Sequence, residues 1–424
     1  MELSNFVIMS DMIHNGKYRI LYSSLTSKIY LLNNKICNKL LNSNFAGIEH
    51  NNIDFLYKEG LIVNSRDEEF ESFKKSIYFN LKNRKSLYIV ILPTADCQFN
   101  CTYCGQTHKN LYMSEDQIKN IIKRIEFKLL SNNIQHLSVG WFGGEPVLAI
   151  KQIELFTSKL MSRIKDKGIS YQSSIVTNGL NLSLPIFKRL VEMNITKFEI
   201  TLDGDANIHN QRRNINSSCN AYNIIINNLF NIINSNYFQK QDIKFIIRCN
   251  VDKTNKYAWI GLINRLCELQ ILDKISSLYL APIHSWGNNA HKTAMPIAEF
   301  ADIELQFVSE LIARGYKIKH IPSHKQRTCI ATSLYDEVID VHGNTHNCTE
   351  IPLVEKYDNI EQVYTRKFQN WYDHLFNSKC SKCNVLPLCL GLCPKQYEEG
   401  VRECPSFKYN LKEMLLLHYY KNKK

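Results

Sequence analysis

From Leu87 onward an apolar strand followed by a helical stretch recurs at a spacing of about 30 residues, the length of one β-α step in a parallel sheet. The strands are apolar along almost their whole length, which predicts that both of their faces are covered. We therefore predict an α/β protein built on a partial (β/α)6 TIM-like barrel. The expected strands are LYIVILPT (87–94), HLSVGWF (136–142), YQSSIVTN (171–178), TKFEITLDG (196–204), IKFIIRCNVD (243–252) and SSLYLAPIH (276–284).

The helix expected after the first strand has the clearest sequence pattern. Ser114 and Gln117 have the spacing of a capping box, in which each side chain bonds the backbone of the other residue. Apolar residues then recur with the period of an α-helix and predict its buried face: Ile118, Ile121, Ile122, Ile125 and Leu129.

Polar and glycine-rich stretches follow every expected strand. They read DCQFNCTYCGQ, GGEP, TNG, DGD, NVDKTN and HSWGNN in chain order. Because the carboxyl ends of barrel strands meet on one face, we expect these loops to surround one site.

The chain is expected to contain three parts. Residues 1–84 contain a predicted hairpin (YRILYSSLTSKIYLL), two short helices, a return strand (LIVN) and a charged stretch that continues as a helix or linker. Residues 85–290 form the partial barrel. Residues 291–424 are expected to form a bridging region and, after about residue 325, a cysteine-rich module stapled by metal.

Composition excludes several classes of protein. No run approaches the ~18 apolar residues of a membrane span, and the start has neither a basic leader nor an apolar signal core. A cytoplasmic location is expected, where the 14 cysteines would stay reduced and act as buried thiols, metal ligands or catalysts. The net charge of +12 comes from lysines spread along the chain, so no nucleic-acid partner is expected.

Cys97, Cys101 and Cys104 lie in the loop after the first strand with the spacing CxxxCxxC. Three thiolates can hold three irons of a [4Fe-4S] cube and leave the fourth iron open, whereas structural zinc normally recruits a fourth protein ligand. The spacing therefore favours an iron-sulfur cluster with one coordination site for another molecule.

These residues resemble the signature of the radical S-adenosylmethionine (SAM) superfamily, CxxxCxΦC, in which Tyr103 is the aromatic residue. The resemblance implies that the open iron binds SAM, whose reductive cleavage gives a 5'-deoxyadenosyl radical that abstracts a substrate hydrogen. GGEP, TNG, TLDGDANIHNQRR and RCN are similar to further segments of this family, and Asp203 is carried over as a cavity residue. The implied cofactor-binding residues are Tyr103, Gly143, Gly144, Glu145, Asn178, Arg213 and Asn250. Read singly, the glycines could be turn residues, and Glu145 and Asp203 could be helix caps.

A second set of cysteines lies near the carboxyl terminus. Their spacing resembles the SPASM extension of radical SAM enzymes that act on peptides, which implies two auxiliary [4Fe-4S] clusters and three clusters in all. A zinc ribbon is the alternative from spacing alone. The resemblance assigns Cys329, Cys348 and Cys393 to auxiliary cluster I, with an iron left open unless a further cysteine reaches it, and Cys380, Cys383, Cys389 and Cys404 to auxiliary cluster II.

Residues 1–84 resemble the winged-helix-like recognition modules that bind the leader segment of ribosomal precursor peptides. We therefore predict a radical SAM maturase that cross-links such a peptide through C–C or C–heteroatom (ether or thioether) bonds, with a reductant such as flavodoxin or ferredoxin. His284 and Trp286 are further candidates to line the cavity, and the general base is not predicted.

Three alternatives remain at this stage. A peptide epimerase shares all of these motifs. An anaerobic sulfatase-maturating enzyme typically places Asp directly after the cysteine that corresponds to Cys348, where this chain has Thr349. A non-catalytic iron-sulfur carrier or scaffold gives no reason for GGEP and TNG to lie on successive loops.

Overall fold

The computed structural model describes residues 1–215, 220–284, 289–351, 353–354 and 371–422. The chain divides into two compact units. The sheet unit comprises Arg84–Pro296 and Tyr335–Arg366, and the terminal unit comprises Met1–Asn83, Ile297–Leu334 and Lys367–Lys424. The peptide-recognition and cluster-bearing roles expected for the ends of the chain stay predictions.

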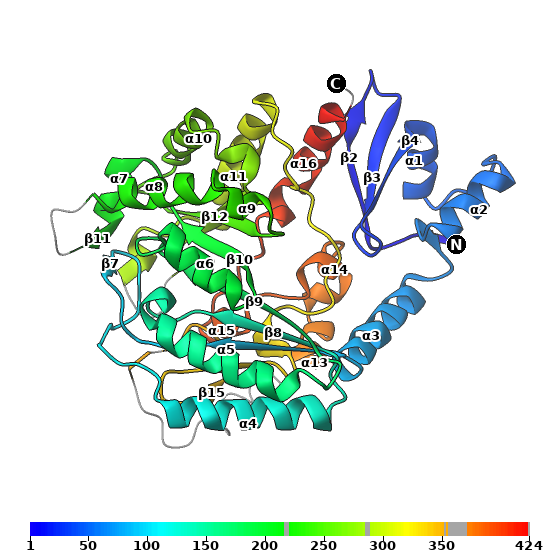
Figure 1. Cartoon of the computed structure of the whole chain (residues 1–424). Coiled ribbons are helices and arrows are strands. Elements are labelled where there is room, and N and C mark those ends of the chain that lie inside the picture. The colour runs from blue at the N-terminus through cyan, green and yellow to red at the C-terminus, as the bar shows by residue number, and fades with distance from the viewer. Residues whose placement is uncertain (216–219, 285–288, 352, 355–370, 423–424) are drawn as a thin grey trace. The chain divides into compact units, whose positions relative to one another are not determined.

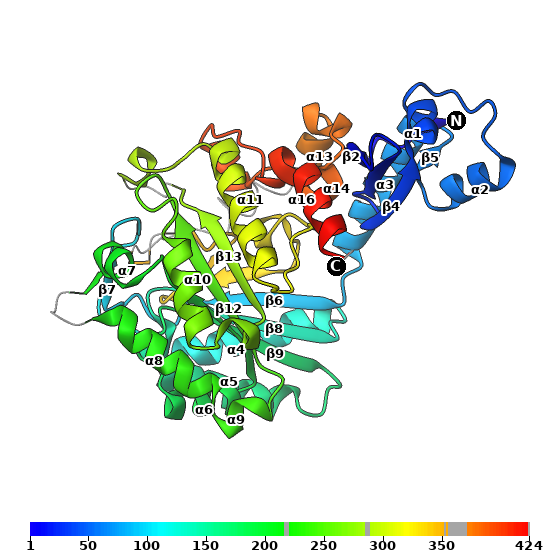
Figure 2. The ribbon, with the colours of Figure 1, turned by 90° about the horizontal axis from the view of Figure 1, so that it is seen from above.

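All six strands that the sequence predicts are present in the sheet unit and pair in parallel (Figure 1). Five helices alternate with them and lie along one face of the sheet, as Figures 1 and 2 show for α4, α5, α6, α8 and α10. The strands are β6 (Ser86–Ile91), β8 (His136–Trp141), β9 (Ser170–Thr177), β10 (Ile195–Thr201), β12 (Lys244–Val251) and β13 (Ser277–Pro282). The helices are α4 (Glu115–Ser131), α5 (Ile150–Ile164), α6 (Leu184–Glu192), α7 (Ala206–Arg212), α8 (Ala221–Ile233), α9 (Asn236–Gln239) and α10 (Trp259–Glu268), with the short turns η1 (Pro146–Ala149), η2 (Leu272–Lys274) and η3 (Asn289–Lys292).

The predicted capping box at the start of α4 is confirmed. Ser114 Oγ accepts from the backbone N–H of Gln117, and the Gln117 side chain accepts from the backbone N–H of Ser114. The buried face of α4 consists of the five predicted residues Ile118, Ile121, Ile122, Ile125 and Leu129. The capping box and the helical period in the sequence thus predicted correctly where α4 begins and which of its faces is buried.

Two further strands extend the sheet, and the sequence reasoning did not find them. β14 (Glu337–Ile339) pairs in parallel with β6, and β15 (Thr345–His346) pairs with β14. The strand order is β13-β12-β10-β9-β8-β6-β14-β15, so the sheet is open and the barrel does not close. A three-residue strand is too short to show a period, which is why its sequence gave no signal.

Partly buried ion pairs hold the segment around β14 on the sheet unit. Arg84 donates to Asp336 at 2.8 Å, and Arg124 of α4 donates to both carboxylate oxygens of Glu337. Burial pushes the pKa of Glu337 upward, but the Arg124 hydrogen bond and the Lys128 charge outweigh burial and hold the pKa below its ordinary value. These contacts fix the start of residues 335–354, which lead to Cys348.

The predicted hairpin and the two helices that follow it are confirmed in the terminal unit. β3 (Tyr18–Ser23) and β4 (Lys28–Asn33) are antiparallel, and β2 (Val7–Ile13) adds a third strand on the other side of β3. The charged stretch is helical, whereas the predicted return strand pairs with β1 (Glu2–Leu3) rather than with the hairpin. The further elements are α1 (Asn34–Leu41), α2 (His50–Lys58), β5 (Ile62–Val63) and α3 (Arg66–Lys82). A winged-helix identity for this part stays a prediction.

The carboxyl-terminal helices complete the terminal unit and pack on its strands. Leu411 and Leu415 of α16 share a core with Ile20 and Tyr22 of β3. The elements are α11 (Ile297–Ala313), η4 (Ile330–Thr332), α13 (Trp371–Phe376), η5 (Lys379–Lys382), α14 (Leu386–Cys389), α15 (Pro394–Glu398) and α16 (Phe407–Lys421).

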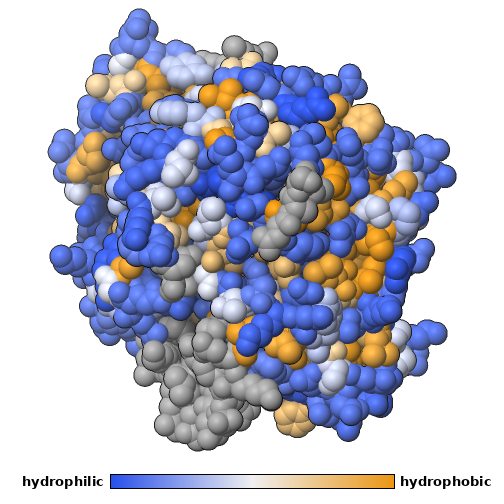
Figure 3. Space-filling view, turned by 90° about the vertical axis from the view of Figure 1, so that its left-hand side faces the viewer, coloured by the Kyte–Doolittle hydropathy of each residue, from blue (hydrophilic) through white to orange (hydrophobic). Residues whose placement is uncertain are grey.

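None of the helices in the described ranges is long and apolar enough to cross a membrane. Figure 3 shows a face covered mostly by hydrophilic side chains, which apolar side chains reach in patches.

Candidate functional site

The loops at the carboxyl ends of the strands line a cavity of about 310 Å³ in the sheet unit. The structure brings the three cysteines of the first motif and His284 to this cavity. All seven cofactor-binding residues implied by the resemblance line it as well: Tyr103, Gly143, Gly144, Glu145, Asn178, Arg213 and Asn250.

The loop that carries Cys97, Cys101 and Cys104 is held by backbone pairing. β7 (Phe99–Cys101) is antiparallel to β11 (Arg213–Ile215), so Cys101 lies opposite Arg213. The backbone N–H of Thr102 also donates to the carbonyl of Arg212 at 2.9 Å. Burial raises the pKa of the Cys101 thiol to about 11, and the Arg213 charge opposes this shift. Three partly buried thiols on one loop are a donor set that suits iron-sulfur ligation.

The GGEP loop after β8 packs directly on the backbone that precedes Cys97. The backbone N–H of Gly144 donates to the carbonyl of Thr94 at 3.2 Å, and that of Glu145 donates to the carbonyl of Asp96 at 2.7 Å. A Cβ atom on Gly144 would lie 2.1 Å from the Asp96 carbonyl oxygen, and one on Gly143, whose φ is +118°, would lie 2.8 Å from the Thr94 oxygen. Both glycines are therefore required by close backbone approach and not by the turn alone.

Glu145 joins the GGEP loop to the TNG loop. Its carboxylate accepts from Thr177 Oγ1 at 2.6 Å, from the backbone N–H of Asn178 at 2.7 Å and from that of Val147 at 3.0 Å. The last bond caps η1, so the helix-cap alternative for Glu145 is also realised. With three bonds from the protein itself, Glu145 positions the two loops, and its predicted contact with the cofactor stays a prediction.

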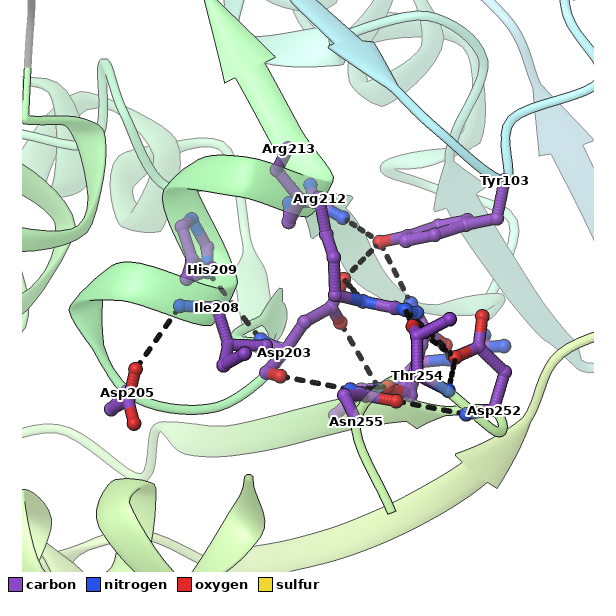
Figure 4. A network of polar contacts seen from close by, with 12 residues as sticks. Tyr103, Asp203, Asp205, Ile208, His209, Arg212, Arg213, Asp252, Thr254 and Asn255 are labelled. Atoms are coloured by element: carbon purple, nitrogen blue, oxygen red, sulfur yellow. Dashed lines mark hydrogen bonds and ion pairs between the residues drawn. The ribbon is translucent and has the colours of Figure 1, made fainter. Parts of the chain in front are cut away.

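Tyr103 is the centre of a buried polar network (Figure 4). Its hydroxyl donates to Asp203 Oδ2 at 2.6 Å and accepts from Arg213 at 2.6 Å and from Asn250 Nδ2 at 3.1 Å. The backbone N–H of Asn250 donates to the other oxygen of Asp203 at 3.1 Å. A phenol oxygen can donate one hydrogen bond and accept two, and the Tyr103 hydroxyl makes all three. It therefore joins the cysteine loop to β11, to β12 and to the segment that follows β10.

The adjacent residues Arg212 and Arg213 have different surroundings. Arg212 donates to Asp252 at 2.9 Å and to Thr254 at 2.7 Å, and its guanidinium lies 5.2 Å from the centre of the Tyr103 ring. Arg213 lines the cavity and lies over the Phe99 ring. Arg212 therefore ties α7 to the end of β12, while Arg213 is the one of the pair that reaches the cavity.

Asp203 is fully buried and contacts the cavity wall through its bonds with Tyr103 and Asn250. The sequence analysis expected Asp203 in the cavity wall, whereas the structure has it behind that wall. Burial and then the charge of Arg248 lower the pKa of His284. Trp286 lies outside the described residues.

The sequence reasoning missed several residues that line the cavity. Gln106 donates to the carbonyl of Ile351 at 2.8 Å and accepts from the backbone N–H of Leu353 at 3.1 Å, which brings Glu350 to the cavity. No local pattern links positions so far apart in the chain. Arg248 also lines the cavity, and its spacing of two residues from Asn250 on a strand could have indicated this.

The cysteines of the terminal unit form two groups. The charges of Cys380 and Cys404 act on Cys389, and the charges of Cys383 and Cys380 act on Cys404. Lys408 donates to Cys383 Sγ at 3.2 Å. These are the four residues expected at auxiliary cluster II, and their role as ligands stays a prediction.

Cys329 and Cys393, expected at auxiliary cluster I, both belong to the terminal unit, where the charge of Cys393 acts on Cys329. Cys348 belongs to the sheet unit, where its sulfur accepts from the backbone N–H of Glu350 at 3.4 Å. Of the remaining cysteines, Cys37 and Cys249 are fully buried, and Cys219 lies outside the described residues. In the ranges that the structure describes, no three His, Cys, Asp or Glu side chains are grouped to hold a metal ion.

Comparison with known proteins identifies the segment that carries the cysteine loop. Residues 91–230 match the Radical SAM superfamily. The radical SAM cyclopropyl synthase TigE of Paramaledivibacter caminithermalis is 23% identical over 416 residues, which cover 86% of this chain and 81% of TigE. A cysteine-type anaerobic sulfatase-maturating enzyme of Clostridium novyi is 23% identical over 358 residues, which cover 76% of this chain and 94% of the relative.

Solved structures share the fold. Native anSMEcpe with bound AdoMet superposes with a TM-score of 0.58 at 18% identity, over 80% of this chain and 99% of that chain. SuiB of Streptococcus suis, bound to its precursor peptide SuiA, superposes with a TM-score of 0.52 at 16% identity, over 96% of this chain and 98% of that chain. Members of this superfamily use SAM and a [4Fe-4S] cluster. The matched domain agrees with the cysteine loop and its cavity, so residues 91–230 form a radical SAM domain, and the relatives that this chain resembles are enzymes.

Proposed function

We propose that this enzyme modifies a ribosomally made precursor peptide by forming a cross-link, most directly a carbon–carbon bond. The observation that carries the proposal is the convergence of three thiols and seven expected cofactor residues on one cavity. Two likenesses support the substrate and the bond. SuiB, whose fold covers 96% of this chain, binds a precursor peptide. TigE is named a cyclopropyl synthase, and the synthesis of a cyclopropyl group requires a new carbon–carbon bond.

In this proposal the chain's own residues hold and orient the cofactors. Cys97, Cys101 and Cys104 bind the cluster, and Arg213 is placed to receive the SAM carboxylate because its guanidinium lines the same cavity beside Cys101. When bound, the cluster and SAM supply a 5'-deoxyadenosyl radical, and auxiliary clusters supply an acceptor for the electron that a new bond releases. Tyr103 fixes Arg213 through their 2.6 Å hydrogen bond.

Two auxiliary clusters, making three in all, are part of the proposal. Their support is the grouping of Cys380, Cys383, Cys389 and Cys404 and of Cys329 with Cys393. Thiolates at these positions suit iron-sulfur clusters and zinc alike, so elemental analysis decides between them.

The three-stranded sheet of the terminal unit is proposed to bind the leader segment of the peptide. Its order is β2-β3-β4, so β4 is an edge strand that pairs only with β3 among the described residues. The edge of β4 offers backbone donors and acceptors to which an extended peptide adds as a further strand. Exposed Lys28 and Leu31 on β4 would contact the side chains of that peptide.

The test is anaerobic reconstitution with SAM, a reductant and the short peptide encoded beside this gene. Loss of two hydrogen atoms from the peptide supports a cross-link. Unchanged mass with uptake of solvent deuterium indicates an epimerase and contradicts the proposal. Cys101→Ala should abolish release of 5'-deoxyadenosine, and the matched control Cys267→Ala, on α10, should retain it.

Sulfatase maturation is the second candidate, because relatives of that name match both in sequence and in fold. Thr349, where that family typically has an Asp, counts against it. Conversion of a cysteine or serine in a sulfatase peptide to formylglycine would establish this candidate in place of the first.

A further inference from the structure

Arg248 is a second guanidinium in the cavity, besides Arg213. It lies on β12 two residues before Asn250, so both side chains project from the same face of the strand. Arg248 Nε donates to Asn250 Oδ1 at 2.8 Å, and its charge acts on Tyr279, which lies opposite it on β13. These neutral partners fix the orientation of the guanidinium without neutralising it.

Three other wholly or partly buried arginines of the sheet unit are paired with carboxylates, whereas buried Arg213 bonds the Tyr103 hydroxyl. Arg84 pairs with Asp336, Arg124 with Glu337 and Arg212 with Asp252. Arg248 has no ion-pair partner among the residues that the structure describes. Arg248 is partly buried, and without a carboxylate partner its charge is suited to an anion that arrives with a ligand.

The carboxylates that line the cavity or lie on strands beside Arg248 have other partners; Glu350, which also lines the cavity, acts on Cys104. Glu145 accepts three hydrogen bonds from the protein, and Glu199 accepts from Tyr279 at 3.0 Å. SAM brings a single carboxylate, and under the proposed function Arg213 receives it. The charge of Arg248 therefore calls for a second anion, which the cofactor does not provide.

We propose that Arg248 and the neighbouring His284 form a subsite for the carboxylate of an Asp or Glu side chain in the peptide substrate. The inference rests on the proposed function and deepens it, because it makes the substrate acidic close to the position that is modified. A guanidinium fork matches a carboxylate in a two-point contact, which an amide cannot replace. The formal net charge of +12 favours an acidic peptide as well.

The subsite is tested with two capped tripeptides that differ only in charge, N-acetyl-Gly-Glu-Gly-amide and N-acetyl-Gly-Gln-Gly-amide. Their affinities for the reconstituted, SAM-loaded full chain are measured by saturation-transfer NMR. We expect the Glu peptide to bind about tenfold more tightly than the Gln peptide, the ratio that one charge-assisted hydrogen bond provides. Arg248→Gln should remove this preference, and Arg248→Lys should reduce it but not abolish it.

The matched control is Arg265→Gln on the exposed side of α10, which should keep the full preference. Iron content and the urea midpoint of each variant verify that it is folded, and SAM affinity is measured on the same samples by equilibrium dialysis. Equal binding of both peptides to the wild type would overturn the proposal. So would a loss of SAM affinity in Arg248→Gln, because Arg248 would then serve the cofactor. Failure of the proposed function would appear separately, as absence of 5'-deoxyadenosine or of a modified peptide.

Discussion

Gly144→Ala tests whether close backbone approach positions the cysteine loop. The added Cβ would lie 2.1 Å from the Asp96 carbonyl oxygen, and ordinary contact begins at 3.4 Å, so that carbonyl must move by about 1.3 Å. Overpacking costs about 1–3 kcal/mol. The bonds from Gly144 to Thr94 and from Glu145 to Asp96 are worth about 1 kcal/mol each. We therefore expect the free energy of unfolding to fall by about 3–5 kcal/mol.

The same shift should also weaken iron binding. Asp96 directly precedes Cys97, and a ligand displaced by more than about 0.5 Å no longer holds a productive site. Urea unfolding followed by circular dichroism gives the stability, and iron per chain after anaerobic purification gives the occupancy. The control is Gly168→Ala, where φ is +63° and an added Cβ meets nothing within 4 Å, so only about 1–2 kcal/mol of backbone strain is expected. If Gly144→Ala matches this control in stability and in iron, the reasoning is wrong.

Three further changes test single contacts. Tyr103→Phe leaves Asp203 without its 2.6 Å donor. We expect the free energy of unfolding in urea to fall by about 1–3 kcal/mol and equilibrium dialysis to show weaker SAM binding. An unchanged SAM affinity would show that the position of Arg213 does not depend on Tyr103. Glu337→Gln removes the carboxylate between Arg124 and Lys128. The free energy of unfolding, measured in urea at pH 7, should fall by about 2–3 kcal/mol. An unchanged free energy would mean that β14 is held by strand pairing alone. Gln106→Ala removes the bonds to Ile351 and Leu353. The Leu353 amide should then exchange its hydrogen about tenfold faster. An unchanged exchange rate would contradict a role of Gln106 in holding this segment.

Most of the parallel sheet could be predicted from the sequence because its signals are local. Each of the six strands is an apolar run long enough to recognise, and α4 carries both a capping box and a clear period. β14 could not be predicted, because three residues show no period and the strand is stabilised by pairing with β6, about 250 residues earlier in the chain. The open sheet follows from such long-range pairing and not from any local pattern.

The candidate site was predictable where the family pattern is continuous in sequence. The cysteine loop, GGEP and TNG each appear as short motifs, and the rule for the carboxyl ends of parallel strands brings them together. The contacts of Gln106 with Ile351 and Leu353 have no such motif, and neither does the pairing of β7 with β11. The sequence therefore predicts which segments meet at the cavity, but not the side chains that fasten these segments to one another.

The arginines of the site show why residue type alone does not assign a role. Arg212 ends α7 and Arg213 begins β11, and this change from helix to strand directs the two neighbouring side chains to different surroundings. The carboxylate of Asp252 then engages Arg212 behind the cavity wall, whereas Arg213 remains at the cavity with Tyr103. Arg248 has neutral partners in the same region. Because a paired guanidinium is neutralised within the protein and one without a carboxylate is not, the distribution of Asp and Glu side chains selects which arginines can bind an anionic ligand.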